Sequence, residues 1–308
     1  DDELGGAETH AQVTGLGEYL TEDDAHAIAM TRELMDKLNW DTTPAAAPFA
    51  EPLFDEQELM GIVPADEREP YDVREVIARL VDGSDFLEFK ASYAPEMLCG
   101  HARIEGRLVG ILGNNGPIQP TGSTKAAQFI QLCDQSGTPL VFLQNTTGYM
   151  VGSAAERGGA IKHGSKMIQA VANARVPKFT VVLGGSFGAG NYGMCGRGFD
   201  PRFIFSWPTA RTAVMGGAQA AKVMDIVNRA KLERMGAEVN EEALKAMSDG
   251  LRLRLDKESA ALFGTARLWD DGIIDPRDTR RLLGLCLALA AEAEQRTLRG
   301  NTFGVARL

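Results

Sequence analysis

The sequence predicts an α/β protein built on a mostly parallel sheet, followed by a helical arm. From about residue 139 the chain repeats one theme, in which an apolar strand, a glycine-rich segment and a helix follow one another. Strands that alternate with helices usually form a parallel sheet with helices on its faces. The second observation is helical periodicity in residues 217–235, 240–262 and 277–295. These last segments predict the helical arm.

The N-terminal segment predicts a helix and a linker. Residues 21–39 carry apolar side chains at helical spacing, and Thr21 with Asp24 has the pattern of a capping box. The following "DTTPAAAPFAEPLFDEQ" is rich in Pro and Ala, which is typical of a linker. We therefore expect residues 1–60 to be a connecting helix and linker, and residues 61–308 to form one domain.

The next elements are short strands and one helix. The stretches "DFLEFKASYA" and "GHARIEGRLVGILGNN" predict strands, with Glu105 and Gly106 as the tight turn of a hairpin. A helix is expected from Ser123 to about Gln135. It is followed by strand "PLVFLQN", helix "SAAERGGAIKHGSKMIQAVANA", strand "PKFTVVLGG", a glycine loop, a short helix and strand "RFIFSWP".

Composition excludes several classes of function. The net charge of -10 and the lack of a basic stripe argue against nucleic-acid binding. With no apolar run of membrane-spanning length and no signal-peptide pattern, we expect no membrane association and a location in the bacterial cytoplasm or the mitochondrial matrix. The four cysteines lie far apart and predict free thiols, and no pair of histidines has metal-ligand spacing, so no metal site is expected.

A G-x-G-x-x-G pattern at Gly188, Gly190 and Gly193 follows the strand "KFTVV". A dinucleotide site also needs an acidic residue about 20 positions later, at the end of the next strand. Asp200 comes too early and the next acid is Asp225, so this function is not supported. Two alternatives stay open: the glycines allow a helix to pack tightly on a strand, or they expose backbone amides to an anion.

The anion hypothesis rests on the start of the short helix. The first amides of a helix have no intrahelical acceptor, and small residues such as Ala189 and Gly190 leave them accessible. The segment "NTTGYMVG" follows the preceding strand at the same edge of the predicted sheet. The two segments together predict a crevice in which negative charge could be stabilised.

Several long stretches resemble one family. "PLVFLQNTTGYMVG", "ERGGAIKHGSKMIQAVANARVPKFTVVLGGSFGAGNYGMCGRGFDPRFIFSWP", "AVMGGAQAAKV" and "WDDGIIDPRDTR" resemble carboxyltransferase (β) subunits of biotin-dependent acyl-CoA carboxylases, in the methylcrotonyl-CoA and geranyl-CoA carboxylase branch. The resemblance implies a crotonase-like (ClpP/crotonase) spiral of ββα units, present twice per subunit. This chain resembles the second copy, so the first domain, which supplies most of the acyl-CoA site, is expected to be missing.

The resemblance also implies a mechanism and partners. Biotin, carried by a biotin carboxylase/biotin carrier α subunit, would deliver the carboxyl group to an enoyl-CoA, and the ureido oxygen of biotin would bind the amides of Ala189 and Gly190. Many relatives have Gly-Ala at this pair. The biotin crevice would be formed by residues on both segments, namely Phe187, Gly188, Thr147, Gly148 and Tyr149. Coenzyme A enters as part of the substrate, and a homo-oligomer, a hexamer in the family, is expected.

Two other functions remain as alternatives. A crotonase-type enoyl-CoA hydratase or isomerase would need a glutamate beside the acyl group, and a non-catalytic assembly fragment would need no site. Substrate-assisted proton transfer needs no protein base, which agrees with four scattered histidines: His10, His26, His101 and His163. Glu156 and Arg157 are expected to serve a helix end. The stretches "NNGPIQPTGSTKAAQFIQLC" and "GNTFGVARL" favour geranyl-CoA over 3-methylcrotonyl-CoA, and the chain alone is expected to be inactive.

Overall fold

The computed structural model describes residues 2–37, 47–64, 66, 69–236 and 239–295. The chain divides into two compact units, one made of residues 1–44 with 291–308 and the other of residues 45–290. Residues 45–60 therefore belong to the same unit as the sheet. The domain boundary at residue 60 stays a prediction.

The first unit contains the predicted N-terminal helix, α3 (Asp24–Asp36). Its cap is Asp23, whose carboxylate accepts a hydrogen bond of 2.7 Å from the His26 amide. The predicted start at Thr21 is therefore wrong, because Asp23 already satisfies the open amide of the first turn. Three short helical segments that the sequence did not predict precede it: α1 (Asp2–Gly5), α2 (Ala7–Thr9) and η1 (His10–Thr14).

The second unit is built on a seven-stranded sheet with the order β1-β2-β3-β4-β5-β6 and with β7 paired to β5. Strands β1 to β3 are antiparallel, whereas β3 to β6, and the β5–β7 pair, are parallel. The bounds are β1 (Leu87–Glu88), β2 (Met97–Ile104), β3 (Arg107–Asn114), β4 (Leu140–Thr146), β5 (Lys178–Phe187), β6 (Phe203–Ser206) and β7 (Arg211–Ala213). The mostly parallel α/β sheet is confirmed, and β7 was not predicted.

The predicted hairpin turn is confirmed. Ile104 pairs with Arg107, and the two residues between them, Glu105 and Gly106, have φ of 47° and 78°. Two consecutive positive φ values are typical of a type I′ turn. The Asp82 carboxylate accepts hydrogen bonds from both turn amides, at 2.9 and 2.7 Å, and so fixes the turn.

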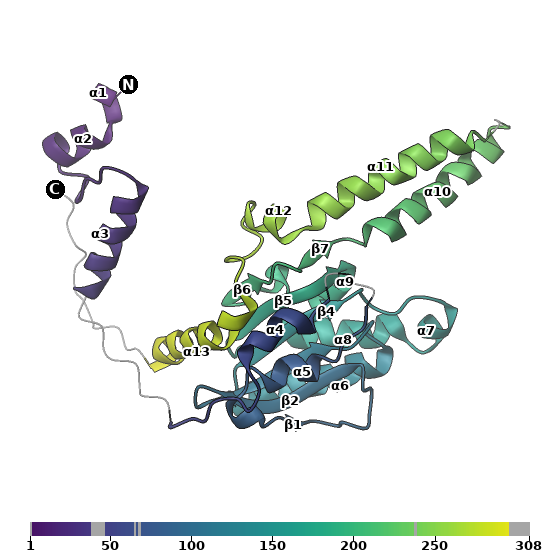
Figure 1. Ribbon diagram of the computed structural model, residues 1–308, viewed down its shortest axis with the longest axis horizontal. Helices are drawn as coiled ribbons and strands as arrows, with labels where there is room; N and C mark the ends of the chain where they lie inside the picture. The colour runs from purple at the N-terminus through teal and green to yellow at the C-terminus, as the bar shows by residue number, and fades with distance from the viewer. Residues whose placement is uncertain (1, 38–46, 65, 67–68, 237–238, 296–308) are drawn as a thin grey trace. The chain divides into compact units, whose positions relative to one another are not determined.

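Helices cover both faces of the sheet (Figure 1). In β4, Leu140 and Phe142 face a core that includes residues of α6 (Pro120–Ser136) and α8 (Ala160–Asn173). Val141 and Leu143 face the opposite core, formed with α4 (Leu59–Ile62), α5 (Val73–Ala78) and α13 (Thr279–Gln295). The alternation of side chains along one strand thus supplies two cores. Four short helical turns complete the elements: η2 (Glu56–Glu58), η3 (Asp82–Ser84), η4 (Arg197–Phe199) and η5 (Pro276–Asp278).

Glycines change two predicted elements. The single helix expected from Ser153 is divided into α7 (Ser153–Arg157) and α8, because Gly159 between them has a φ of 84°. The glycine loop expected after "PKFTVVLGG" is absent, since β5 continues to Phe187 and α9 (Gly188–Gly193) begins at the next residue. The strand therefore passes directly into the helix.

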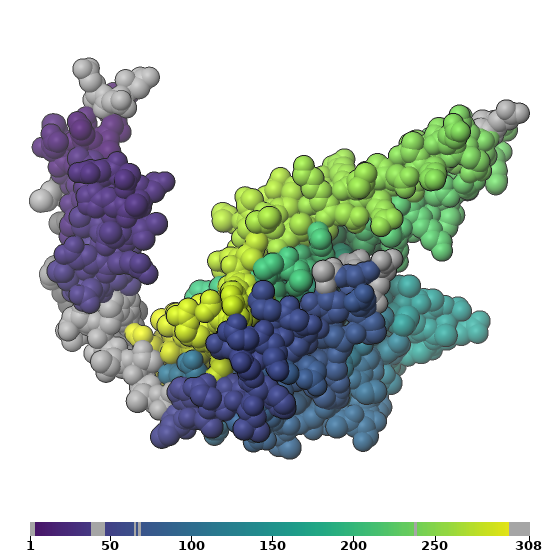
Figure 2. Space-filling model, viewed as in Figure 1, coloured from purple at the N-terminus to yellow at the C-terminus, as the bar shows by residue number. Residues whose placement is uncertain are grey.

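The C-terminal helices lie close to their predicted ranges. Helices α10 (Gly217–Arg234) and α11 (Glu241–Ser259) pack on each other, and Figure 2 shows them as one continuous green ridge. The predicted helix 240–262 ends at Ser259 because Ala260 is extended, and α12 (Ala261–Thr265) follows. Across the described part of the chain, no helix is both long and apolar enough to cross a bilayer.

Candidate functional site

The candidate site is the junction at which β5 passes into α9. Phe187 is extended, with φ -117° and ψ 142°, and Gly188 turns the chain with a φ of 55°. Within the described part of the chain, no side chain caps α9. Because the first amides of a helix lack intrahelical acceptors, the amides that follow Gly188 are donors available to a ligand.

The junction residues differ in exposure. Ala189 is exposed and Gly188 is half-buried, whereas Gly190 is buried. Phe187 is only 4% exposed. The Phe187 ring therefore belongs to the protein interior, and this residue shapes the turn through its backbone.

The segment after β4 packs directly against α9. A Cβ atom added at Gly190 would lie 2.8 Å from Gly148 Cα and 3.0 Å from Thr146 Cγ2. Gly148 itself has a φ of 116°, and its amide donates to Thr146 Oγ1 at 3.1 Å. The structure thus brings together the two segments that the sequence placed at one edge of the sheet, with Thr147 exposed beside them.

Tyr149 supports α9 from the interior. Its hydroxyl donates to the Gly164 carbonyl at 3.4 Å, and a Cβ atom at Gly193 would overlap that hydroxyl. Burial raises the pKa of Tyr149, so the phenol stays neutral. The backbone on either side of Tyr149 pairs with Ile118, which donates to Gly148 O and accepts from the Met150 amide, each at 2.9 Å. The ring therefore acts here as a support between α8 and α9.

A cavity of ≈ 540 Å³ opens at the start of α9. The start of α9 forms one wall of this cavity, and the others are formed by β7, α11, α12 and the segments that directly follow β7 and α12. The apolar or aromatic members of those other walls are Ala213, Val214, Leu255, Phe263 and Trp269. These walls could not be predicted, because no local pattern connects residues so far apart in the chain.

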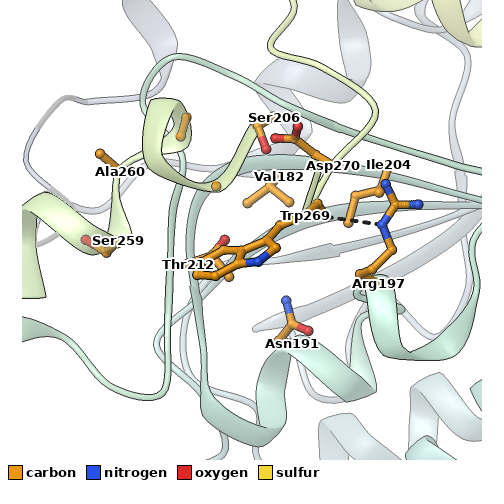
Figure 3. A pocket seen from close by; sticks show the side chains of 12 residues that line it. Val182, Asn191, Arg197, Ile204, Ser206, Thr212, Ser259, Ala260, Trp269 and Asp270 are labelled. Atoms are coloured by element: carbon orange, nitrogen blue, oxygen red, sulfur yellow. Dashed lines mark hydrogen bonds between the residues drawn. The ribbon is translucent and has the colours of Figure 1, made fainter. Parts of the chain in front are cut away.

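A smaller cavity of ≈ 200 Å³ adjoins the first, and four residues line both: Asn191, Thr212, Ser259 and Trp269 (Figure 3). Asp270 lines the smaller cavity and is 7% exposed. Its Oδ1 atom has no hydrogen-bond partner among the residues that the structure describes. Arg197 donates to the Trp269 carbonyl at 3.2 Å, the dashed line in Figure 3, and to Asp271 at 2.8 Å.

Two titratable side chains near the junction are already paired with other residues. Glu258 lines the larger cavity but is paired with Arg254 at 2.8 Å. His163 contacts Thr124 Oγ1 at 3.2 Å, on the interface of α6 and α8. In the described ranges, no three His, Cys, Asp or Glu side chains gather as a metal site would require.

The cysteines are free and buried, as predicted: Cys99, Cys133, Cys195 and Cys286. Burial raises the pKa of each thiol, to about 11 for Cys286 and about 12 for Cys195. Thiols in this state are poor nucleophiles at neutral pH.

Comparison with known proteins identifies relatives over the whole chain. The family model "Carboxyl transferase domain" matches residues 1–303. The chain is 51% identical to the "Probable biotin-dependent acyl-coenzyme A carboxylase beta2 subunit" of Mycobacterium tuberculosis, over 100% of the chain and 58% of that protein. It is 46% identical to the mitochondrial methylcrotonoyl-CoA carboxylase beta chain of Arabidopsis thaliana, over 100% of the chain and 53% of the relative.

A solved structure agrees with these relatives. The beta subunit of geranyl-CoA carboxylase from P. aeruginosa is 59% identical and superposes with a TM-score of 0.86. The match covers 100% of this chain and 59% of that subunit. The chain thus spans somewhat more than half the length of the proteins it resembles.

Proposed function

The chain belongs to the carboxyl transferase family of biotin-dependent acyl-CoA carboxylase β subunits, and from this premise we propose that it forms the biotin-facing half of such a subunit. Its fold is the crotonase-like fold of the carboxyltransferase structures that it matches, as the sequence predicted. Because the chain covers 58% of the M. tuberculosis relative, the reaction, substrates and partners are part of the proposal.

The proposed reaction moves a carboxyl group from carboxybiotin to an enoyl-CoA, either geranyl-CoA or 3-methylcrotonyl-CoA. The observation that carries it is the open start of α9, where exposed Ala189 and the adjoining Gly190 follow a turn that none of the described side chains caps. Biotin, when bound, supplies the carboxyl group and a ureido oxygen that becomes negative as that group leaves. The two amides stabilise this charge, and one such donor is typically worth about 3 kcal/mol.

The remaining residues at the junction orient and enclose the reactants. Gly188 turns the backbone, and Gly188 and Ala189 line the cavity at the start of α9. Phe263 and Trp269 give that cavity aromatic walls, which reduce the access of water to the reactants. Glu258 is held by Arg254 and is not placed as a free base. This arrangement supports proton transfer within the substrates over a hydratase or isomerase that depends on a glutamate.

The partners follow from the same proposal. The biotin is carried by a biotin carboxylase/biotin carrier α subunit, and the acyl-CoA binds mainly to residues outside this chain. Assembly into a homo-oligomer, a hexamer in the proposal, is supported by exposed apolar side chains on α10 and α11, namely Val223, Met224, Ile226, Val227, Met247 and Leu253. The compartment would be the bacterial cytoplasm or, as in the A. thaliana relative, the mitochondrion.

Of the two acyl groups, sequence identity favours geranyl-CoA. Identity is 59% to the P. aeruginosa geranyl-CoA carboxylase subunit and 46% to the A. thaliana methylcrotonoyl-CoA carboxylase chain. The stretch "NNGPIQPTGSTKAAQFIQLC" forms the end of β3 and most of α6, next to the site segment at Ile118. The "GNTFGVARL" stretch lies outside the described residues.

The test is an assay of the complete subunit with its biotin-carrying partner. Fixation of labelled bicarbonate is measured with geranyl-, 3-methylcrotonyl-, propionyl- and acetyl-CoA, and we expect the first or second to be preferred. The 308-residue chain with the same partner is expected to fix none. Hydration of an enoyl-CoA without biotin, or fixation by the short chain, would contradict the proposal.

A further inference from the structure

A buried chain of hydrogen bonds connects β4, β5 and α9 next to the Ala189–Gly190 amides. The Asn191 Nδ2 group donates to Ser186 Oγ at 2.8 Å, and the Ser186 hydroxyl donates to Gln144 Oε1 at 2.5 Å. Gln144 Nε2 then donates back to the α9 end at Met194 O, at 2.6 Å. Gln144 and Ser186 are both 0% exposed. We refer to Gln144, Ser186 and Asn191 as the α9 network.

The donors and acceptors of the α9 network fit in one arrangement. The Gln144 amide nitrogen faces two carbonyls, Met194 O at 2.6 Å and Asn191 O at 3.5 Å, so its oxygen must face Ser186. The Ser186 hydroxyl then donates to that oxygen and keeps a lone pair for Asn191 Nδ2. Asn191 Oδ1 in turn packs against Gly196, where a Cβ atom would overlap it. Each hydrogen bond of the α9 network therefore fixes the donor and acceptor roles of the next one.

The network lies where the regular pairing of β4 and β5 is interrupted. Gln144 pairs with Val182 but Thr146 pairs with Ser186, so β5 has extra residues between these two points. The amide of Gly185 in this bulge donates to the Asn145 side chain at 3.2 Å. On the β4 side, side-chain bonds thus replace ladder bonds in holding the last residues before α9.

We infer that Gln144, Ser186 and Asn191 are positioning residues that fix the direction of the first amides of α9. The inference rests on the proposed function, because only then do these amides bind the ureido oxygen. In this inference the three side chains bind one another and the α9 backbone, and they act on the reaction only through the position of that backbone. Their effect on the rate comes from geometry, since a displacement of about 1 Å in a catalytic group can reduce a rate about 100-fold.

The decisive variant is Gln144→Glu, which keeps the shape but makes one donor titratable. As a carboxylate, the introduced group faces two carbonyl oxygens and cannot donate to Met194 O, so α9 loses its anchor. As a neutral acid it can donate again while accepting from Ser186. The ratio of variant kcat to unaltered kcat in the complete enzyme is therefore expected to rise towards one as the pH falls, with KM for acyl-CoA unchanged.

A matched control carries the same change on the surface. Gln128 is exposed on α6, and its Oε1 accepts from Lys90 at 2.6 Å, so Gln128→Glu adds one negative charge far from α9. Its kcat ratio is expected to stay flat with pH. Ser186→Ala, which interrupts the network at its centre, is expected to lower kcat by about 10- to 100-fold at every pH.

A second measurement separates this inference from the proposed function. Hydrogen exchange of residues 186–196 in the complete subunit is expected to be faster in Ser186→Ala than in the unaltered protein, and faster in Gln144→Glu only at high pH. If the unaltered enzyme transfers no carboxyl group, the proposed function fails and this exchange alone decides whether the network holds α9. If the unaltered enzyme is active, a pH-independent Gln144→Glu ratio with unchanged exchange would overturn the inference.

Discussion

The substitution Gly190→Ala tests the contact between α9 and the segment after β4. The added Cβ would lie 2.8 Å from Gly148 Cα, whereas ordinary contacts begin at 3.4 Å, so the two segments must separate by about 0.6 Å. The obstacle is backbone, which cannot rotate away as the end of a side chain can. The displacement therefore moves the Gly190 amide itself.

The expected effect is larger on the rate than on stability. Overpacking costs about 1–3 kcal/mol, while replacing glycine by alanine in a helix returns about 1 kcal/mol. We expect unfolding to be easier by about 0–2 kcal/mol. For the rate, a displacement of this size is expected to lower kcat about 10-fold, and Gly190→Val, which adds two further methyl groups, on the order of 100- to 1,000-fold.

The assay is steady-state carboxyl transfer by the complete subunit with its partner, together with thermal unfolding and the oligomeric state of each variant. Gly250→Ala is the matched control, because Gly250 is also inside a helix but a Cβ there meets nothing within 4 Å. It should leave turnover unchanged and raise stability slightly. A Gly190→Val enzyme that assembles normally and turns over at the unaltered rate would refute the assignment of this amide.

Three further predictions concern the surroundings of the site and the core. Gly193→Ala should destabilise the fold, because the added Cβ overlaps the Tyr149 hydroxyl, and Tyr149→Phe should remove this overlap. A double-mutant cycle of denaturant unfolding should give a coupling energy of about 1–2 kcal/mol between the two substitutions. Purely additive effects would contradict the contact. Thr279→Val should cost about 1–3 kcal/mol in denaturant unfolding, because the Trp207 indole N–H, which donates to Thr279 Oγ1 at 2.9 Å, loses its acceptor in the core; a neutral result would show that the indole finds another partner. Burial raises the pKa of Cys286 to about 11, whereas the thiol of an unfolded chain ionises at about pH 8.5. The contribution of the neutral Cys286 thiol to the free energy of unfolding is therefore present below about pH 8.5 and is lost as the pH rises towards 11. Cys286→Ala should make this fall in unfolding free energy shallower, and an unchanged slope would exclude the thiol as its source.

Much of the fold could be predicted because its signals are local. Glu105 and Gly106 specify the hairpin by themselves, since both adopt positive φ in a two-residue turn. The start of α6 was placed three residues too late, because Gln119 precedes it without a side-chain cap and Pro120 opens the first turn. Proline fits there because it has no amide hydrogen to satisfy.

The candidate site could be predicted only in its backbone. The glycines and Ala189 indicated an open helix start, and their neighbours Gly148 and Tyr149 followed from the order of strands. The walls at Phe263 and Trp269 depend on how α11 and α12 return to β7, which no local pattern indicates. Gln144 and Ser186 were missed for another reason, since single polar residues in apolar strands give no signal until their partners are known.

The three glycines of the G-x-G-x-x-G pattern are needed for different reasons. Gly188 adopts a positive φ, whereas Gly190 and Gly193 are three residues apart on α9 and face Gly148 and the Tyr149 hydroxyl. Close packing on the neighbouring segment thus explains two of them without a ligand. Packing and the proposed anion binding are therefore compatible, because the contact at Gly148, together with the α9 network, holds α9. In the proposed function, Ala189 distinguishes this junction from one that only packs. It stays exposed beside a first turn that no side chain of the described residues caps, while its neighbour Gly190 is buried.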